Sequence, residues 1–107
     1  MSVKKLKGVL TAIVTPVDAQ DQFNEAAMRE QIDRQIAAGN GIFCGGTNGE
    51  FFALTESEKR SVAEVTMDQV AGRASVVGHV GEVSTAECVR VGLHIASLGV
   101  DAIAAIT

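Results

Sequence analysis

Hydrophobic residues follow two alternating patterns along this chain. Short runs rich in β-branched and small apolar residues are typical of buried strands in a parallel sheet. Between them lie longer segments in which apolar residues recur every three or four positions, as on one face of a helix. The runs predict strands over residues 9–15, 41–44, 75–80 and 102–106. Because strand starts roughly thirty residues apart are typical of βαβ units, we expect an α/β fold with parallel strands.

Each of the three intervening segments carries the start and stop signals of a helix. Asn24 is placed to cap the first helix, and Thr55–Glu58 and Ser84–Glu87 have the capping-box pattern for the second and third. The predicted apolar stripes are Met28, Ile32 and Ile36; Ala63, Met67 and Val70; and Cys88, Val91, Ile95 and Leu98, with Gly39, Gly72 and Gly99 as the respective stop signals. Strand and helix are therefore predicted to alternate strictly.

The last predicted strand, over residues 102–106, indicates that further strand–helix units are expected after it. It is apolar, and a sheet that ended with it would leave an edge and a face uncovered. Residues 104–107, Ala-Ala-Ile-Thr, also resemble residues 12–15, Ala-Ile-Val-Thr, which proline follows. We therefore expect residues 1–107 to be the N-terminal portion of a single (β/α)8 TIM-barrel domain, cut after its fourth strand.

Composition and charge exclude several classes of protein. The chain of 107 residues is 47% hydrophobic with a net charge of −4, and only 4% of its residues are aromatic. A nucleic-acid-binding protein is expected to have a basic face and stacking rings instead. Lys4, Lys5 and Lys7 precede an apolar run, but Thr11 and Pro16 interrupt the pattern of a secretory signal. No apolar stretch approaches the ~20 residues of a membrane span.

The potential metal ligands are scattered. Cys44 and Cys88 lack metal-ligand spacing, and Asp18 and Asp21 form no metal set with the two histidines. Reduced thiols of this kind are typical of a cytoplasmic protein. We therefore expect a soluble cytoplasmic protein with neither a metal nor a cofactor.

A glycine-rich stretch follows the second predicted strand. Ligands of parallel α/β folds bind beyond the carboxyl ends of the strands, which is where residues 45–50, Gly-Gly-Thr-Asn-Gly-Glu, are expected to lie. The glycines permit a sharp turn with exposed N–H groups, Thr47 and Asn48 add a hydroxyl and an amide, and Glu50 could buttress the loop. Such donors suit a carboxylate or phosphate oxygen. From the spacing alone, a tight turn that binds nothing is an equally good interpretation.

Two other phosphate-binding patterns do not fit this stretch. A P-loop would end in Gly-Lys-Ser or Gly-Lys-Thr, and a dinucleotide fingerprint would open directly into a helix, whereas residues 51–54 intervene here. Outside the loop, His79 ends an apolar strand near the same edge and could either touch a second substrate or be a hydrogen-bonded strand-end residue. His94 is expected to be structural. Thr11 and Thr15 are expected to line the barrel interior.

Three stretches resemble the dihydrodipicolinate synthase / N-acetylneuraminate lyase family in order and spacing. They are LTAIVTPVD, GGTNGEFFALTESEK and VVGHVGEVSTAE, and the resemblance extends over essentially the whole chain, with residues 46–50 as its most specific part. It implies a (β/α)8 barrel, usually a homotetramer. It also implies a lyase that forms a Schiff base between a lysine and pyruvate or a related 2-oxo acid, and then makes or breaks a carbon–carbon bond, often with an aldehyde partner, or dehydrates.

The same resemblance implies roles for the loop residues. Thr47 would join a proton relay to an active-site tyrosine, Asn48 would bind the substrate carboxylate, and Gly46, Gly49 and Glu50 would support them. Dihydrodipicolinate synthase has two successive threonines where this chain has Thr47 and Asn48. The asparagine at position 48 therefore favours relatives that act on sugar-derived 2-oxo acids.

The family's lysine and tyrosine lie on later strands. This chain has no tyrosine, and its lysines lie at positions 4, 5, 7 and 59. Lys59 is expected to face outward from its helix, so none suits a Schiff base. We therefore expect the span by itself to be inactive.

A rival interpretation is a small non-enzymatic α/β binding or regulatory module that is complete at 107 residues. A phosphoacceptor receiver would be the commonest form, with clustered acids after the first strand and an aspartate at the end of the third. Here the third predicted strand ends in Gly78-His79-Val80. The lyase interpretation is therefore preferred.

Overall fold

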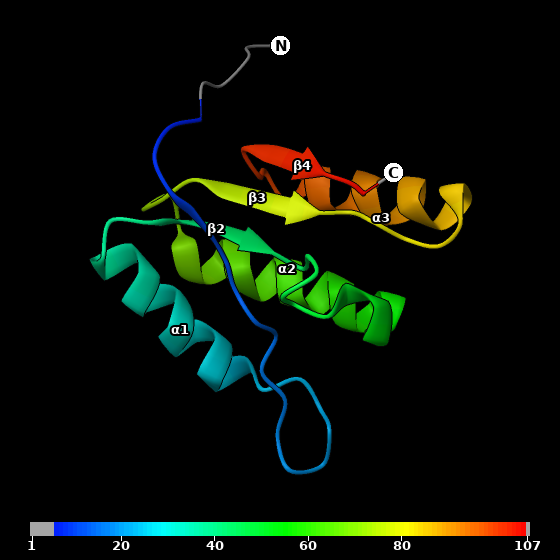
Figure 1. Ribbon diagram of the computed structural model, residues 1–107, viewed down its shortest axis with the longest axis horizontal. Helices are drawn as coiled ribbons and strands as arrows, with labels where there is room; N and C mark the ends of the chain where they lie inside the picture. The colour runs from blue at the N-terminus through cyan, green and yellow to red at the C-terminus, as the bar shows by residue number, and fades with distance from the viewer. Residues whose placement is uncertain (1–5, 107) are drawn as a thin grey trace.

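Strands and helices alternate in the computed structural model, which describes residues 6–106 (Figure 1). Lys4, Lys5 and Thr107 lie outside the described residues. The elements are β1 (Leu10–Ala12), α1 (Glu25–Ala37), β2 (Gly41–Cys44), the 3-10 helix η1 (Phe51–Ala53), α2 (Glu56–Val70), β3 (Val76–His79), α3 (Thr85–Ser97) and β4 (Ala102–Ala104). Strand β2 has the predicted bounds, and the other three strands are shorter than predicted.

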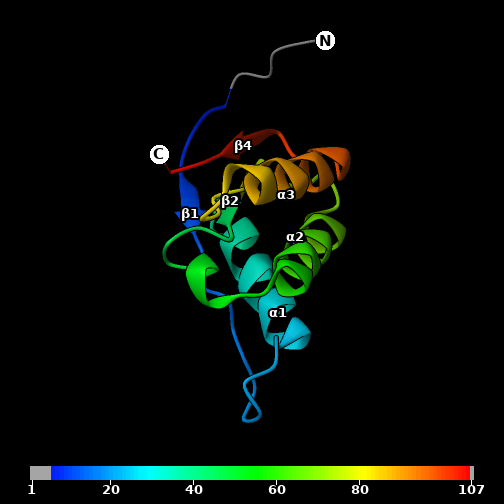
Figure 2. The same ribbon diagram turned by 90° about the vertical axis from the view of Figure 1, so that its right-hand side faces the viewer.

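The strands form one parallel sheet in the order β1-β2-β3-β4. Figure 1 shows β2, β3 and β4 pointing the same way, and Figure 2 shows all three helices on one side of the sheet. Crossovers of one hand between successive neighbouring strands place every helix on the same face. This is the arrangement of a sheet that curls into a barrel with helices outside, so the predicted α/β class with parallel strands is confirmed.

The two faces of the sheet have different environments. Ile42 and Val76 are fully buried on the helix face, in a core with Met28 and Ile32 of α1. Ile42 and Cys44 point toward the helices. Phe43 stands between them in β2 and therefore lies on the opposite face, because side chains alternate along a strand. In a closed barrel that opposite face becomes the interior.

Thr11 corrects one expectation from the sequence. Its register partner is Ile42, so it shares the helix face, and its Oγ1 donates to Oε1 of Gln35 in α1 at 2.9 Å. Thr11 therefore does not line the barrel interior. Thr15 lies beyond the end of β1, beside the glycine loop, with its Oγ1 buried.

The predicted helix caps are largely confirmed. Thr55 and Glu58 form a complete capping box, with both reciprocal hydrogen bonds present. In α3 only half of the box forms within the described residues: Ser84 Oγ accepts from the N–H of Glu87 at 3.1 Å. Each helix ends two residues before its predicted stop glycine, and Gly39, Gly72 and Gly99 have left-handed φ values of 83°, 78° and 86°.

Loss of the α1 cap gives a first test of this packing. Asn24 Oδ1 accepts from the N–H of Ala27 at 3.1 Å, which satisfies one of the free donors of the first turn. Asn24→Ala is expected to lower the free energy of unfolding by about 1 kcal/mol, and Asn24→Ser by much less. Urea denaturation of both variants measures the difference, and equal loss in both would show that the cap is not the cause.

Candidate active site

The glycine loop lies at the carboxyl end of β2, and packing restricts its residues. Gly45 has a left-handed φ of 71°. A Cβ at Gly46 would lie 2.5 Å from Cε1 of Phe43, and one at Gly49 would lie 3.0 Å from Oγ1 of Thr15. Side chains at these positions would push the loop away from the strand ends. The glycines therefore hold the loop close to the end of the sheet.

The loop presents several unused hydrogen-bond donors. Two bonds close the turn: the N–H of Glu50 donates to Thr47 O at 3.0 Å, and the N–H of Phe51 donates to Gly46 O at 3.3 Å. Within residues 6–106, the N–H groups of Thr47, Asn48 and Gly49 donate to no protein acceptor. The Thr47 and Asn48 side chains are exposed, and Asn48 Nδ2 makes one long bond of 3.5 Å to the carbonyl of Ala12. These donors can bind a carboxylate.

Glu50 supports the loop through its backbone. Its left-handed φ of 56° turns the chain into η1, and its carbonyl accepts from the N–H of Ala53 at 2.9 Å. The Glu50 side chain forms no cap bond to η1. Glu50 is also one of the residues that line a neighbouring cavity.

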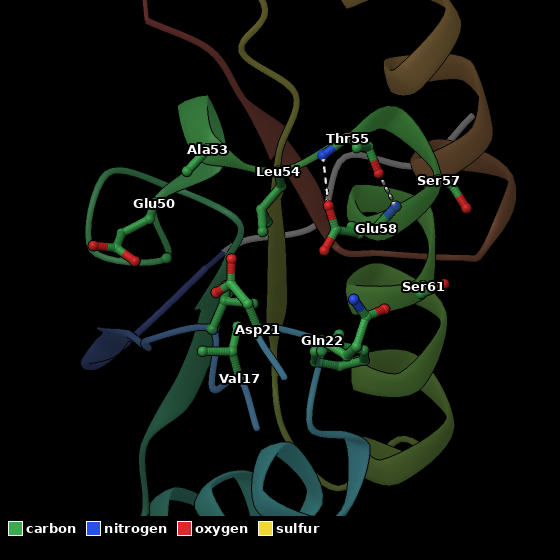
Figure 3. A pocket seen from close by; sticks show the side chains of 13 residues that line it. Val17, Asp21, Gln22, Glu50, Ala53, Leu54, Thr55, Ser57, Glu58 and Ser61 are labelled. Carbon is green, nitrogen blue, oxygen red and sulfur yellow. Dashed lines mark hydrogen bonds between the residues drawn. The ribbon is translucent and has the colours of Figure 1, made fainter. Parts of the chain in front are cut away.

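That cavity, of about 610 Å³, lies between the β1–α1 segment, the loop and the start of α2 (Figure 3). Asp21 and Glu58 are acidic residues of its wall, and the carboxyl group of Glu50, a third lining residue, points away from them (Figure 3). Thr47 and Asn48 are not among its lining residues. An anion would meet like charge there, so the cavity does not suit the carboxylate of a 2-oxo acid.

His79 lies beneath the loop as the last residue of β3. Its side chain is buried, with ring centroids 4.7 Å from Phe51 and 6.1 Å from Phe43. The N–H of Gly81 donates to its Nδ1 at 3.3 Å, so it is the hydrogen-bonded strand-end residue that the sequence allowed. Burial lowers the pKa of His79 below its ordinary value of 6.5; the Gly45 backbone opposes this and the Lys59 charge adds to it.

Lys59 does not face outward, which corrects the prediction from its helix. Its Nζ lies 2.5 Å from Oε1 of Glu82, in the β3–α3 loop, and both side chains are about nine-tenths buried (9% and 12% exposed). The ammonium also lies 5.6 Å from the ring centroid of Phe51. Glu82 follows 23 positions later in the chain, so no helical spacing could reveal the pair.

His94 and Asp18, the other candidate residues, bind groups of the chain itself. His94 lies in α3, with its Nε2 2.9 Å from Oε1 of Glu64 in α2. Oδ1 of Asp18 accepts from the N–H groups of Gln20 and Gln22 in a turn. Across residues 6–106, no group of three or more His, Cys, Asp and Glu side chains is placed to hold a metal ion. Over the same residues, no helix is both long enough and apolar enough to cross a membrane.

The geometry agrees with the family resemblance, and comparison with known proteins shows which family the chain belongs to. Residues 5–107 match the model of the dihydrodipicolinate synthetase family. The chain belongs to this family. It is 35% identical over 103 residues to N-acetylneuraminate lyase of Escherichia coli K12, a match that covers 95% of this chain and 35% of the relative. The chain therefore spans about a third of the length of the curated relatives it matches.

Solved structures of family members have the same fold. CdNal from Clostridium difficile, solved in complex with mannosamine, superposes with a TM-score of 0.93 at 31% identity, covering 97% of this chain and 37% of that one. A prophage protein of the family from E. coli K12, solved in complex with pyruvate, gives 0.88 at 28% identity, covering 92% and 33%. These relatives are TIM barrels, and this chain corresponds to their N-terminal third.

Proposed function

We propose that the complete protein is a lyase that binds pyruvate or a related 2-oxo acid as a lysine Schiff base. The observation that carries the proposal is the donor-rich loop of residues 45–50 at the carboxyl end of β2, in a chain that belongs to the dihydrodipicolinate synthetase family. A family member solved in complex with pyruvate supports the choice of substrate class.

In this proposal Asn48 and the neighbouring N–H groups bind the substrate carboxylate. An amide nitrogen has two donor hydrogens, so Asn48 keeps one after its bond to Ala12. Hydrogen bonds to a carboxylate are stronger than those between neutral groups. The exposed Thr47 hydroxyl, which has no partner within the described residues, passes a proton to a tyrosine supplied by a later part of the barrel.

The Schiff-base lysine is also assigned to a later strand. Lys7 is exposed before β1, and Lys59 is buried in its ion pair with Glu82. Residues 1–107 are then the N-terminal portion of one barrel domain. Ile103 of β4 supports this: it is 51% exposed on the face that carries the helices, where a further helix can cover it.

The substrate we propose is a sugar-derived 2-oxo acid, cleaved to or made from pyruvate and an aldehyde. Asparagine at position 48 and curated relatives named N-acetylneuraminate lyase both favour this over lysine biosynthesis. We further propose a homotetramer in the cytoplasm. The two free thiols, Cys44 and Cys88, suit a reducing compartment.

Trapping the Schiff base tests the proposal. The complete protein is incubated with pyruvate, reduced with borohydride and weighed. We expect one adduct per chain, on a lysine outside residues 1–107, because an amine must lose its proton to attack and needs a site that lowers its pKa. The same treatment of the 107-residue span is expected to give no stoichiometric adduct. Absence of any adduct on the complete protein would refute the proposed function, and an adduct on Lys59 would refute the assignment of the lysine.

A further inference from the structure

His79 is a buried titratable group directly beneath the donor loop, and the proposed chemistry does not use it. Its ring lies close to the rings of Phe43, before the loop, and Phe51, after it. The β3 strand pairs with β2, so the end of β3 lies beside the start of the loop. The His79 ring therefore lies near Phe43 and Phe51, the aromatic residues that flank residues 45–50 on either side.

The hydrogen bond from Gly81 to His79 favours the neutral ring, whereas the Gly45 backbone favours the charged one. The N–H of Gly81 donates to Nδ1, so Nδ1 is an acceptor and a neutral ring has its hydrogen on Nε2. A Cβ at Gly81 would overlap the imidazole ring, so glycine permits this close approach. Nε2 is buried and donates no hydrogen bond within residues 6–106.

The charged groups around the ring also favour the neutral form. Lys59 of α2 raises the cost of a second positive charge, and Glu82 of the β3–α3 loop is already paired with Lys59. The two aromatic rings near it, Phe43 and Phe51, carry no charge. Protonation of Nδ1 would set an N–H donor against the N–H of Gly81.

We propose that His79, held as the neutral Nε2–H tautomer, is a positioning residue that fixes residues 45–50 in the conformation that binds the carboxylate. The inference rests on the proposed function. The ring packs near Phe43 and Phe51, which flank the loop, and the bond from Gly81 fixes its orientation. Protonation disrupts this arrangement, so carboxylate binding weakens as pH falls through the pKa of His79.

The test compares His79→Phe and His79→Asn in the complete protein. Phenylalanine keeps a ring between Phe43 and Phe51 but has no acceptor for Gly81, whereas asparagine keeps an acceptor near the position of Nδ1. Misplacement of a binding group by about 1 Å can cost 10²-fold in rate. We expect His79→Phe to raise KM for the 2-oxo acid roughly 10-fold, with a smaller change in kcat, and His79→Asn to recover part of the loss.

The pH profile separates positioning from simple packing. In the wild type, KM for pyruvate is expected to rise below the pKa of His79, and in both variants this rise should disappear. An unchanged KM and an unchanged pH profile in His79→Phe would overturn the inference. If His79→Phe does not fold, an acid rise of KM that persists in His79→Asn overturns it equally. Failure of the wild type to form a borohydride-trapped adduct would instead refute the proposed function, and this inference with it.

Discussion

Replacing Thr47 by Val in the complete protein is expected to lower kcat by about 10²–10³-fold, the usual cost of removing one well-placed donor from an active site. Valine keeps the shape of the side chain and removes only the hydroxyl. Because that hydroxyl has no partner in the described part of the chain and is exposed, its loss should not destabilise the fold. Steady-state turnover with a 2-oxo acid, together with the melting temperature, measures the two effects separately.

Thr11→Val is the matched control for that experiment. It removes a hydroxyl from β1 on the helix face, where Oγ1 donates to Gln35. We expect a stability loss of about 1 kcal/mol and turnover close to that of the wild type. Equal turnover in the Thr47 variant and the wild type would mean that residues 45–50 are only a turn.

Lys59→Met is expected to lower the free energy of unfolding by about 3–5 kcal/mol, because it leaves the Glu82 carboxylate buried without its partner. Methionine retains much of the apolar stem, so most of the loss comes from the unpaired charge. The double variant Lys59→Met/Glu82→Leu should recover most of the stability, since apolar replacement of a buried pair is often nearly neutral. Urea denaturation of the single and double variants measures both values.

Arg73→Met provides the comparison at the surface. Arg73 pairs with Asp33 at 2.7 Å, but both side chains are about half exposed, and exposed pairs contribute about 0–1 kcal/mol. If the Lys59 and Arg73 variants lost similar amounts of unfolding free energy, burial of the Lys59–Glu82 pair would not be the cause of the loss.

Local sequence patterns determined the order and type of the elements. The apolar stripes of all three helices lie in the two hydrophobic cores, as predicted. The capping box at Thr55 is complete, and the glycine loop follows β2 as expected. Such features depend on residues within about one helical turn or one strand, so spacing in the sequence reports them directly. The resemblance on residues 46–50 also pointed to the family that residues 5–107 match.

Only the tertiary structure decided which distant residues meet. Thr11 faces Gln35, 24 residues away, because the β1–β2 register sets which side of the strand meets α1. Lys59 is buried against Glu82 rather than exposed on α2, and His79 lies near the two phenylalanines that flank the loop. A helical or strand period fixes the face of a residue within its own element, but what covers that face depends on segments tens of residues away, and these come together only when the sheet and its helices assemble.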